Sequence, residues 1–310
     1  MPPLSRRNLL AGAAAAAGGL LSRRTRAAGD LEPLPERTLG ATGRRVPILG
    51  LGTYPLGTLR PEAKGVAIVE RAVETGARYF DTAPSYGPSE VRLGRGIAGF
   101  PREKLFLATK TLERDGDAAL EELERSLERI GTEYVDSVQV HEVRSLSDVE
   151  TLFRKGGVVA ALEDARRRKK VRFIGITGHR NPDVLLQAIE RHPFDTALVP
   201  VNPFDRLHRS FARTFVPKAR EKGIAVVAMK VYAGGALPSQ QREVPIADLV
   251  RFALAQDGVC VAVPGADSIA HWDEARAADF ASLPDEPARE ALVARCGPHR
   301  GRSSEWYKDA

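Results

Sequence analysis

The sequence predicts an α/β fold, a (β/α)8 TIM barrel preceded by an N-terminal β-hairpin, on three observations. From residue 48 onward, short apolar runs alternate with amphipathic stretches. The runs begin roughly every 30 residues, which is the length of one strand–helix unit. They also lack period-two alternation, as strands buried on both faces do. Eight such units favour a closed parallel barrel, and a doubly wound open sheet is the alternative.

The individual elements can be placed along the chain in order. Residues 37–47, "RTLGATGRRVP", contain a central glycine turn and predict a hairpin that covers the lower end of the barrel. Pro61 and Gly76 enclose one helix pattern. Residues 117–131 show apolar side chains on one helical face and end in Gly131, which suits the left-handed position after a helix. The candidate strands, rich in aliphatic and β-branched residues, span 48–53, 77–80, 105–110, 137–141, 172–177, 197–201, 224–229 and 260–265.

Residues 1–28 differ from the rest of the chain. Their charged side chains are five arginines, and "SRRNLLAGAAAAAGGLL" is a short, weakly apolar run after an arginine pair. The pair Arg6 and Arg7 with this run resembles a twin-arginine export signal, because the run is too short and too rich in Ala and Gly to favour a membrane span. We predict a signal segment at 1–28, a barrel at 29–310, and export by the twin-arginine machinery to the periplasm, with membrane anchoring if the signal is uncleaved. A disordered basic tail is the alternative.

The rest of the chain carries little net charge. The formal charge of +6 falls to about +1 without the five N-terminal arginines, so no basic patch indicates nucleic-acid binding. The two cysteines, Cys260 and Cys296, have neither metal-ligand spacing nor a disulfide pattern. With 43% hydrophobic residues over 310 positions, the chain can bury a large core.

Four ionisable side chains follow three consecutive predicted strands. Asp81 and Tyr86 come after the second strand, in "RYFDTAPSYG", while Lys110 ends the third and His141 the fourth. In parallel barrels the chemistry takes place at the C-terminal ends of the strands, which share one face. Singly, each side chain could be structural: a buried ion pair, a turn aromatic or a polar strand cap. Their occurrence at one end of adjacent strands favours a site.

These residue types suit proton transfer to an oxygen atom. Asp81 would keep the buried Lys110 charged, and Lys110 would lower the pKa of the neighbouring Tyr86 phenol. Such a phenol can donate a proton near neutral pH. His141 could donate a hydrogen bond to the same oxygen, which would suit a carbonyl that becomes an alkoxide as hydride reaches its carbon.

The segments "FDTAPSYGPSEVRLGRGI", "LATK" and "DSVQVHEV" resemble the aldo-keto reductase family, over roughly residues 36–290. The resemblance implies NAD(P)H-dependent reduction of aldehyde or ketone carbonyls to alcohols, or the reverse, with a small carbonyl compound as partner. It also implies that the tetrad just described is catalytic and that Tyr86 is the general acid. A non-catalytic, nicotinamide-binding subunit that senses redox state is the alternative. A metal-dependent hydrolase has no support, because no His and Asp ligand cluster follows strands 1, 5 or 6.

The resemblance assigns the nicotinamide to the ends of strands 5 to 7, and NADPH is the family's usual cofactor. Thr177 stands in place of a serine that holds the nicotinamide amide, whereas Gly178 and Leu198 replace the family's asparagine and glutamine. Asn202 could compensate for these losses. Met229 occupies the place of a stacking aromatic and offers a softer contact.

The outer part of the cofactor site departs further from the family. Lys230 would add charge beside the pyrophosphate, and Gly234 would allow close approach. Gly265 and His271 stand where NADPH-preferring members carry two cations that hold the 2′-phosphate. A histidine holds phosphate less firmly than an arginine fork, so NADH is a second candidate cofactor. The other cofactor candidates follow strands 1 and 8: Gly52, Thr53, Ala266 and Glu274.

Few residues point to substrate. Tyr54, after the first strand, lies where aromatic side chains line the family's pocket. Arg144 could meet an anionic substrate or be a solvated loop arginine. The segment "EWYK" at 305–308 could reach over the barrel mouth or be a frayed terminus.

Overall fold

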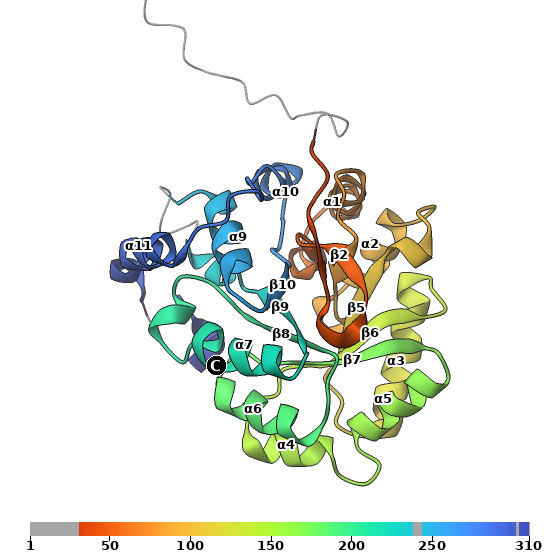
Figure 1. The fold of residues 1–310 in the computed structure, drawn as a ribbon. Helices are drawn as coiled ribbons and strands as arrows, with labels where there is room; N and C mark the ends of the chain where they lie inside the picture. The colour runs from red at the N-terminus through yellow and green to blue at the C-terminus, as the bar shows by residue number, and fades with distance from the viewer. Residues whose placement is uncertain (1–30, 238–243, 302–303, 310) are drawn as a thin grey trace, which may run out of the picture. The chain divides into compact units, whose positions relative to one another are not determined.

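Eight parallel strands follow one another around a barrel in the part of the chain that the computed structural model describes, residues 31–237, 244–301 and 304–309 (Figure 1). Each strand pairs with the next in sequence. Parallel bridges from Leu49 to Ala262 and from Gly52 to Gly265 bring the first and last strands together. The predicted barrel is therefore confirmed, and the open sheet is wrong. The strands are β3 (Leu51–Gly52), β4 (Tyr79–Asp81), β5 (Phe106–Thr111), β6 (Val135–Val140), β7 (Val171–Thr177), β8 (Thr196–Pro200), β9 (Ala225–Met229) and β10 (Val259–Ala262).

Helices follow the strands and lie around the outside of the barrel (Figure 1). They bury one face each, as the sequence pattern predicts; in α3, Leu123, Leu127 and Ile130 are buried. The Asp115 carboxylate caps the start of this helix, and Gly131, with φ of 75°, ends it. The helices are α1 (Glu62–Glu74), α2 (Ser89–Gly96), α3 (Gly116–Ile130), α4 (Leu146–Leu152), α5 (Val158–Arg167), α6 (Pro182–Arg191), α7 (Phe211–Glu221), α9 (Ile246–Ala255), α10 (Ile269–Arg276), α11 (Glu286–Cys296) and α12 (Trp306–Asp309).

An antiparallel hairpin, β1 (Glu36–Thr38) and β2 (Arg45–Pro47), lies at the N-terminal end of the barrel, as predicted. Its buried side chains Leu39 and Val46 belong to the apolar cluster that fills the barrel interior. At the hairpin turn, a Cβ on Gly40 would lie 2.3 Å from the carbonyl oxygen of Gly223, so only glycine allows this approach. The hairpin and the cluster above it therefore close this end.

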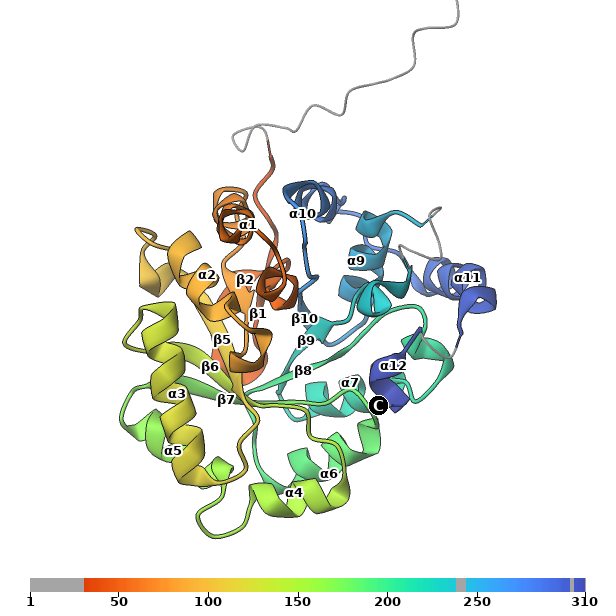
Figure 2. The ribbon, with the colours of Figure 1, turned by 180° about the vertical axis from the view of Figure 1, so that it is seen from behind.

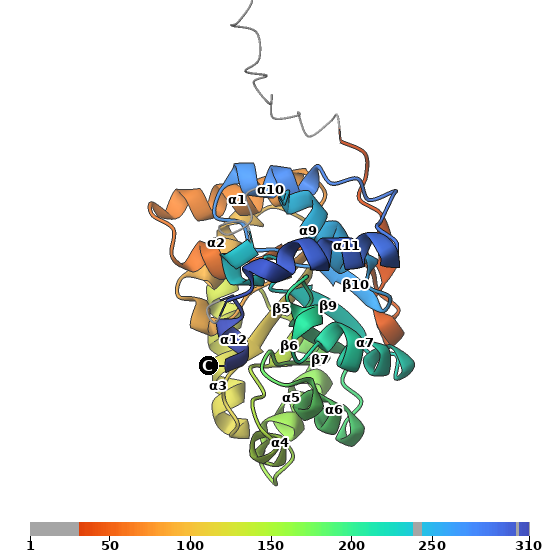
Figure 3. The same ribbon diagram turned by 90° about the vertical axis from the view of Figure 1, so that its left-hand side faces the viewer.

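Helices on the outside of the barrel also contact one another. The side view places α4 and α6 next to each other (Figure 3). From behind, the short α12 lies near the start of α7 (Figure 2).

In the described ranges, every helix falls short of the length and apolar character that a membrane crossing needs. The predicted signal segment, 1–28, lies outside the described residues.

Candidate active site

A cavity of about 590 Å³ opens at the C-terminal ends of the barrel strands. Asp81 and Tyr86 line its inner end, and Asp267 and His271 line its outer end. Between them runs the segment after β9, with backbone glycines at 234 and 235. The cavity therefore connects the predicted catalytic residues with the predicted cofactor-phosphate region. Among the residues that the structure describes, no three His, Cys, Asp or Glu side chains come together in a way that could hold a metal ion.

A buried ion pair forms the base of the inner end. In the register of β4 and β5, Asp81 stands opposite Ala108, and Lys110, two residues further on, points to the same face. The Lys110 Nζ donates to Asp81 Oδ2 at 2.6 Å and to the Thr82 carbonyl oxygen at 2.7 Å. Both charged side chains are almost fully buried, with 1% and 6% of their area exposed. The pairing that the sequence suggested is therefore present.

Tyr86 and His141 complete the inner end. Tyr86 ends a short 3-10 helix, η4 (Pro84–Tyr86), and the Lys110 Nζ lies 4.8 Å from the centre of its ring. His141 follows β6, and its ring centre is 6.0 Å from that of Tyr86. The Nδ1 atom of His141 is buried without a partner among the described residues. The structure thus brings together all four residues that the sequence placed on adjacent strands.

Burial decides the protonation of this group. It raises the pKa of the Tyr86 phenol well above its ordinary value, and the nearby Asp81 carboxylate adds to that shift. Burial, followed by the Lys110 charge, lowers the pKa of His141 well below its ordinary value. Our expectation of a lowered Tyr86 pKa is wrong, because burial, followed by the Asp81 charge, raises it instead. At neutral pH, Tyr86 therefore carries its proton and His141 is a neutral imidazole.

A histidine and an aspartate are in contact at the outer end. The His271 Nδ1 lies 2.5 Å from Asp267 Oδ1, with about half of each side chain exposed. Both residues line the cavity. Next to them, a Cβ on Gly265 would lie 2.9 Å from the Pro55 side chain, so a larger residue would fill this narrow part. A carboxylate therefore stands beside the one basic side chain that the sequence offers for a 2′-phosphate.

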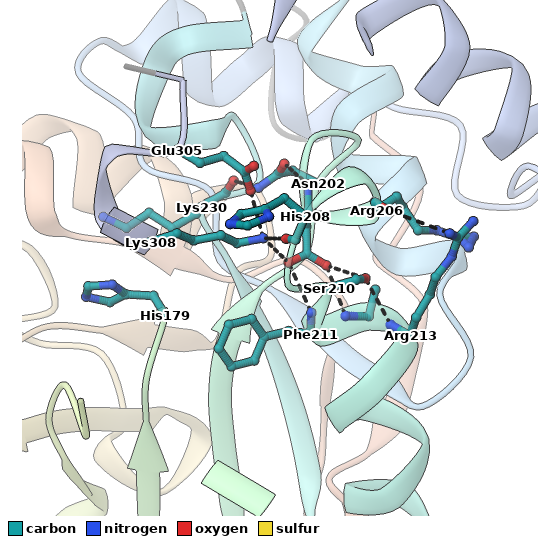
Figure 4. A network of polar contacts seen from close by, with 12 residues as sticks. His179, Asn202, Arg206, His208, Ser210, Phe211, Arg213, Lys230, Glu305 and Lys308 are labelled. Carbon is teal, nitrogen blue, oxygen red and sulfur yellow. Dashed lines mark hydrogen bonds and ion pairs between the residues drawn. The ribbon is translucent and has the colours of Figure 1, made fainter. Parts of the chain in front are cut away.

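The segment around α12 contributes Trp306 to the lining of the cavity. Polar contacts anchor this segment to the residues between β8 and α7 (Figure 4). The buried Lys308 Nζ donates to Asp205 Oδ1 at 2.9 Å and to the His208 carbonyl oxygen at 2.5 Å. Glu305 Oε1 lies 2.8 Å from the same ammonium. These contacts hold the half-exposed Trp306 at the cavity. Of the two roles that the sequence left open for "EWYK", the structure therefore has the segment reaching over the mouth.

Known proteins share both the sequence pattern and this fold. Residues 48–248 match the model of the aldo/keto reductase family. The chain belongs to the aldo/keto reductase family. L-galactose dehydrogenase of Arabidopsis thaliana is 30% identical over 220 residues, which cover 66% of this chain and 67% of that protein. Pyridoxal 4-dehydrogenase of Microbacterium luteolum is 26% identical over 253 residues, which cover 67% and 73%.

A solved structure agrees at the level of the fold. An aldo-keto reductase from Bacillus halodurans in its holo form superposes with a TM-score of 0.70 at 22% identity, covering 84% of this chain and 96% of that one. The family and its named relatives identify the protein as an NAD(P)-dependent oxidoreductase.

The structure divides the predicted cofactor residues of this aldo-keto reductase into two groups. Those that line the cavity are Gly52, Met229, Lys230, Gly234, Gly265 and His271. Those that do not line it are Thr53, Thr177, Asn202, Ala266 and Glu274. Several of the second group already have partners within the fold. Thr177 Oγ1 accepts from the Glu142 backbone N–H at 3.1 Å, and Glu274 accepts from the Ile246 backbone N–H at 3.3 Å. Their roles toward a cofactor stay predictions.

The two predicted substrate residues differ in position. Tyr54 lines the cavity, and its ring meets that of Tyr86 edge-on at 5.1 Å. Arg144 does not line the cavity; its guanidinium pairs with Glu142. Sequence reasoning missed Asp267, which precedes the N-cap Ser268 of α10 and reaches His271 in the first turn of that helix.

Proposed function

We propose that this aldo-keto reductase moves hydride between a nicotinamide cofactor and the carbonyl carbon of an aldehyde or ketone, with Tyr86 as proton donor. The observation that carries the proposal is the placement of the Tyr86 ring over a fully buried Lys110–Asp81 pair, at the inner end of an open cavity. The Lys110 ammonium therefore contacts the Asp81 carboxylate on one side and the Tyr86 ring on the other. This arrangement suits proton transfer from the Tyr86 phenol to a substrate oxygen bound next to it.

Each residue has a defined task in this proposal. Tyr86, protonated because burial raises its pKa, donates its proton to the carbonyl oxygen as charge develops there. The Lys110 ammonium then stabilises the phenolate that the transfer leaves behind. Neutral His141 donates a hydrogen bond to the same oxygen from a ring nitrogen. Asp81 keeps Lys110 charged and fixed in position.

The cavity fits a dinucleotide cofactor in the residues that line it. Gly52 and Gly265 line the cavity. A Cβ there would lie only 2.7 Å from the Val263 carbonyl oxygen or 2.9 Å from the Pro55 side chain, so glycine allows the close packing of the segments that form this part of the cavity. Gly234 and Gly235 present backbone along the same path. A reduced nicotinamide bound here supplies the hydride, so that the alcohol and the oxidised cofactor are the products.

Replacement of Tyr86 with Phe tests this proposal. The change removes only the hydroxyl, so aldehyde reduction should fall by about 10²–10⁴ while cofactor affinity, measured by fluorescence titration, stays the same. Tyr134→Phe is the matched control, because Tyr134 lies just before β6, at the other end of the barrel, and should keep full activity. Reduction by Tyr86→Phe within a few-fold of wild type would exclude Tyr86 as the acid. Cofactor binding without turnover of any aldehyde by wild type would instead favour a non-catalytic subunit.

We further propose that the protein discriminates weakly between NADPH and NADH. The support is the outer end of the cavity, where His271 is the one basic residue of the pair that the family uses and Asp267 lies against it. A phosphate placed there would meet a carboxylate as well as an imidazole. Side-by-side titration with the two cofactors tests this, and a preference for NADPH of about a thousandfold would refute it.

We also propose that residues 1–28 direct export through the twin-arginine route. The support is the arginine pair ahead of a weakly apolar run. Replacement of Arg6 and Arg7 with Lys should leave the protein in the cytoplasmic fraction. Unchanged appearance of the protein in the periplasmic fraction would rule out this route.

A further inference from the structure

Lys230 stands in a cage of aromatic rings inside the cavity. Its Nζ lies 5.7 Å from the ring centre of Tyr54, 5.1 Å from that of Trp306 and 5.5 Å from that of Tyr307. Two of these rings come from the segment around α12 and one follows β3. Lys230, Tyr54 and Trp306 line the same cavity as Asp81 and Tyr86.

The Lys230 ammonium differs from the other buried ammonium groups in its partners. Lys110 and Lys308 each donate to a carboxylate and to a backbone carbonyl. In the described residues, no hydrogen bond or ion pair is found at the Lys230 Nζ. Aromatic faces attract a cation but satisfy none of its three N–H donors as a carboxylate does. Burial also lowers the pKa of Lys230, so the group gains from an anion that approaches through the cavity.

The backbone holds Lys230 in a strained conformation. Its φ is 53°, in the left-handed region that side-chain-bearing residues seldom adopt, and such strain is concentrated at functional sites. The Lys230 carbonyl accepts from Asn202 Nδ2 at 2.9 Å and from the Ala233 backbone N–H at 2.7 Å. Asn202 Nδ2 also lies 3.1 Å from the Tyr307 hydroxyl. Asn202 therefore links the Lys230 backbone to one ring of the aromatic cage. The ammonium is therefore placed by the fold.

We propose that Lys230 binds the carboxylate of an anionic carbonyl substrate while the carbonyl group lies at Tyr86. The Tyr54 ring adjoins both groups, edge-on to Tyr86 at 5.1 Å and 5.7 Å from the Lys230 Nζ. The substrate class is therefore an aldehyde or ketone that also carries a carboxylate. The proposal rests on the proposed function and names its substrate class.

The charges around Lys230 favour a substrate over the cofactor's phosphates. The charged groups that act on its ammonium are Glu142, Lys110 and Asp81, which all belong to the tetrad or adjoin it. The Tyr54 ring, 5.7 Å from the Lys230 Nζ, also meets the Tyr86 ring at 5.1 Å. The ammonium therefore lies toward the inner end of the cavity, where the carbonyl group is proposed to react.

A matched pair of substrates tests the proposal on the full-length protein. 4-Formylbenzoate and its methyl ester share the aldehyde and the ring, and differ in the anion. Wild type should prefer the carboxylate. Lys230→Met, which keeps length and removes charge, should lower kcat/KM for 4-formylbenzoate by about tenfold or more, the value of one charge-assisted hydrogen bond. It should leave the methyl ester within about threefold, and Lys230→Arg should restore most of the preference.

The outcomes separate this proposal from its alternatives. An equal loss for both aldehydes in Lys230→Met, together with weaker cofactor binding, would assign Lys230 to the cofactor's diphosphate and overturn the proposal. Equal use of the two aldehydes by wild type would also overturn it. If wild type reduces neither aldehyde, the proposed function fails, and binding decides the present question. Quenching of tryptophan fluorescence by benzoate but not benzamide, lost in Lys230→Met, would then support the anion site, and its absence would refute it.

Discussion

Two contacts between a carboxylate and a nitrogen base, of almost equal length, lie at the two ends of one cavity, and they differ in exposure. Lys110 and Asp81 are 2.6 Å apart with 1% and 6% of their side chains exposed. His271 and Asp267 are 2.5 Å apart with 49% and 56% exposed. A buried charge that loses its partner is costly, whereas an exposed pair contributes little. Burial, and not distance, therefore sets how strongly each end depends on its pair.

The difference matches what each end has to do. In the proposed function, the inner end must hold a proton donor and a cation in fixed positions, which a buried pair with defined hydrogen bonds achieves. The outer end faces solvent, and a weak contact there would allow either NADPH or NADH to bind. Variants at Asp81, Lys308 and Asp267 test how strongly buried and exposed contacts around the cavity contribute.

The largest effect is expected for Asp81→Asn. The change leaves Lys110 buried without a counter-charge, so the free energy of unfolding should fall by about 3 kcal/mol and aldehyde reduction should be lost. Urea denaturation and steady-state kinetics measure the two effects. Asp267→Asn is the matched control at the outer end and should cost less than about 1 kcal/mol. Equal losses in the two variants would show that burial does not distinguish the pairs.

A smaller effect is expected for Lys308→Met, which removes the anchor of the cavity wall. Asp205 keeps hydrogen bonds from the backbone N–H groups of Phe211 and Ala212, so the loss of stability should be about 1–3 kcal/mol. Trp306 should become more accessible to acrylamide, measured by fluorescence quenching. Lys218→Met, which breaks an exposed pair with a glutamate on α7, should change neither property. Unaltered quenching in Lys308→Met would mean that the wall holds without its anchor.

The smallest effect is expected for Asp267→Ser. Without this carboxylate, the affinity for NADPH relative to NADH should rise by about two- to fivefold, as for an exposed charge contact, and less at high salt. Fluorescence titrations with both cofactors measure the ratio. Asp257→Ser removes a carboxylate from the turn before β10, at the other end of the strand, and should leave the ratio unchanged. A rise in the control variant as large as in Asp267→Ser would indicate a long-range charge effect.

The sequence predicted the barrel and the tetrad because both depend on local patterns. The strand spacing places Asp81, Lys110 and His141 at one edge of the sheet, and the structure has them there. The cage around Lys230 depends on Trp306 and Tyr307, which are far away in sequence and reach the cavity only through a buried anchor. No local pattern contains that information.

The protonation state of Tyr86 could not be predicted from the sequence either. Its pKa depends on how deeply the phenol is buried and where the Lys110 donors point, and neither can be read from residue order. Arg144 was ambiguous for the same reason, since the position of Glu142 decides that its guanidinium is paired outside the cavity.

The hairpin at the N-terminal end has a kinetic consequence. Leu39 and Val46 belong to the apolar cluster that fills the barrel interior, so no passage runs through the barrel. In the proposed function, cofactor and carbonyl compound would then arrive and depart at the C-terminal ends of the strands, where the cavity among the described residues opens. The molecule that lies deeper has to bind first and leave last, and a slowly departing outer molecule delays the exchange of the inner one. Turnover should therefore follow an ordered sequence of binding and release, set by the closed floor of the barrel.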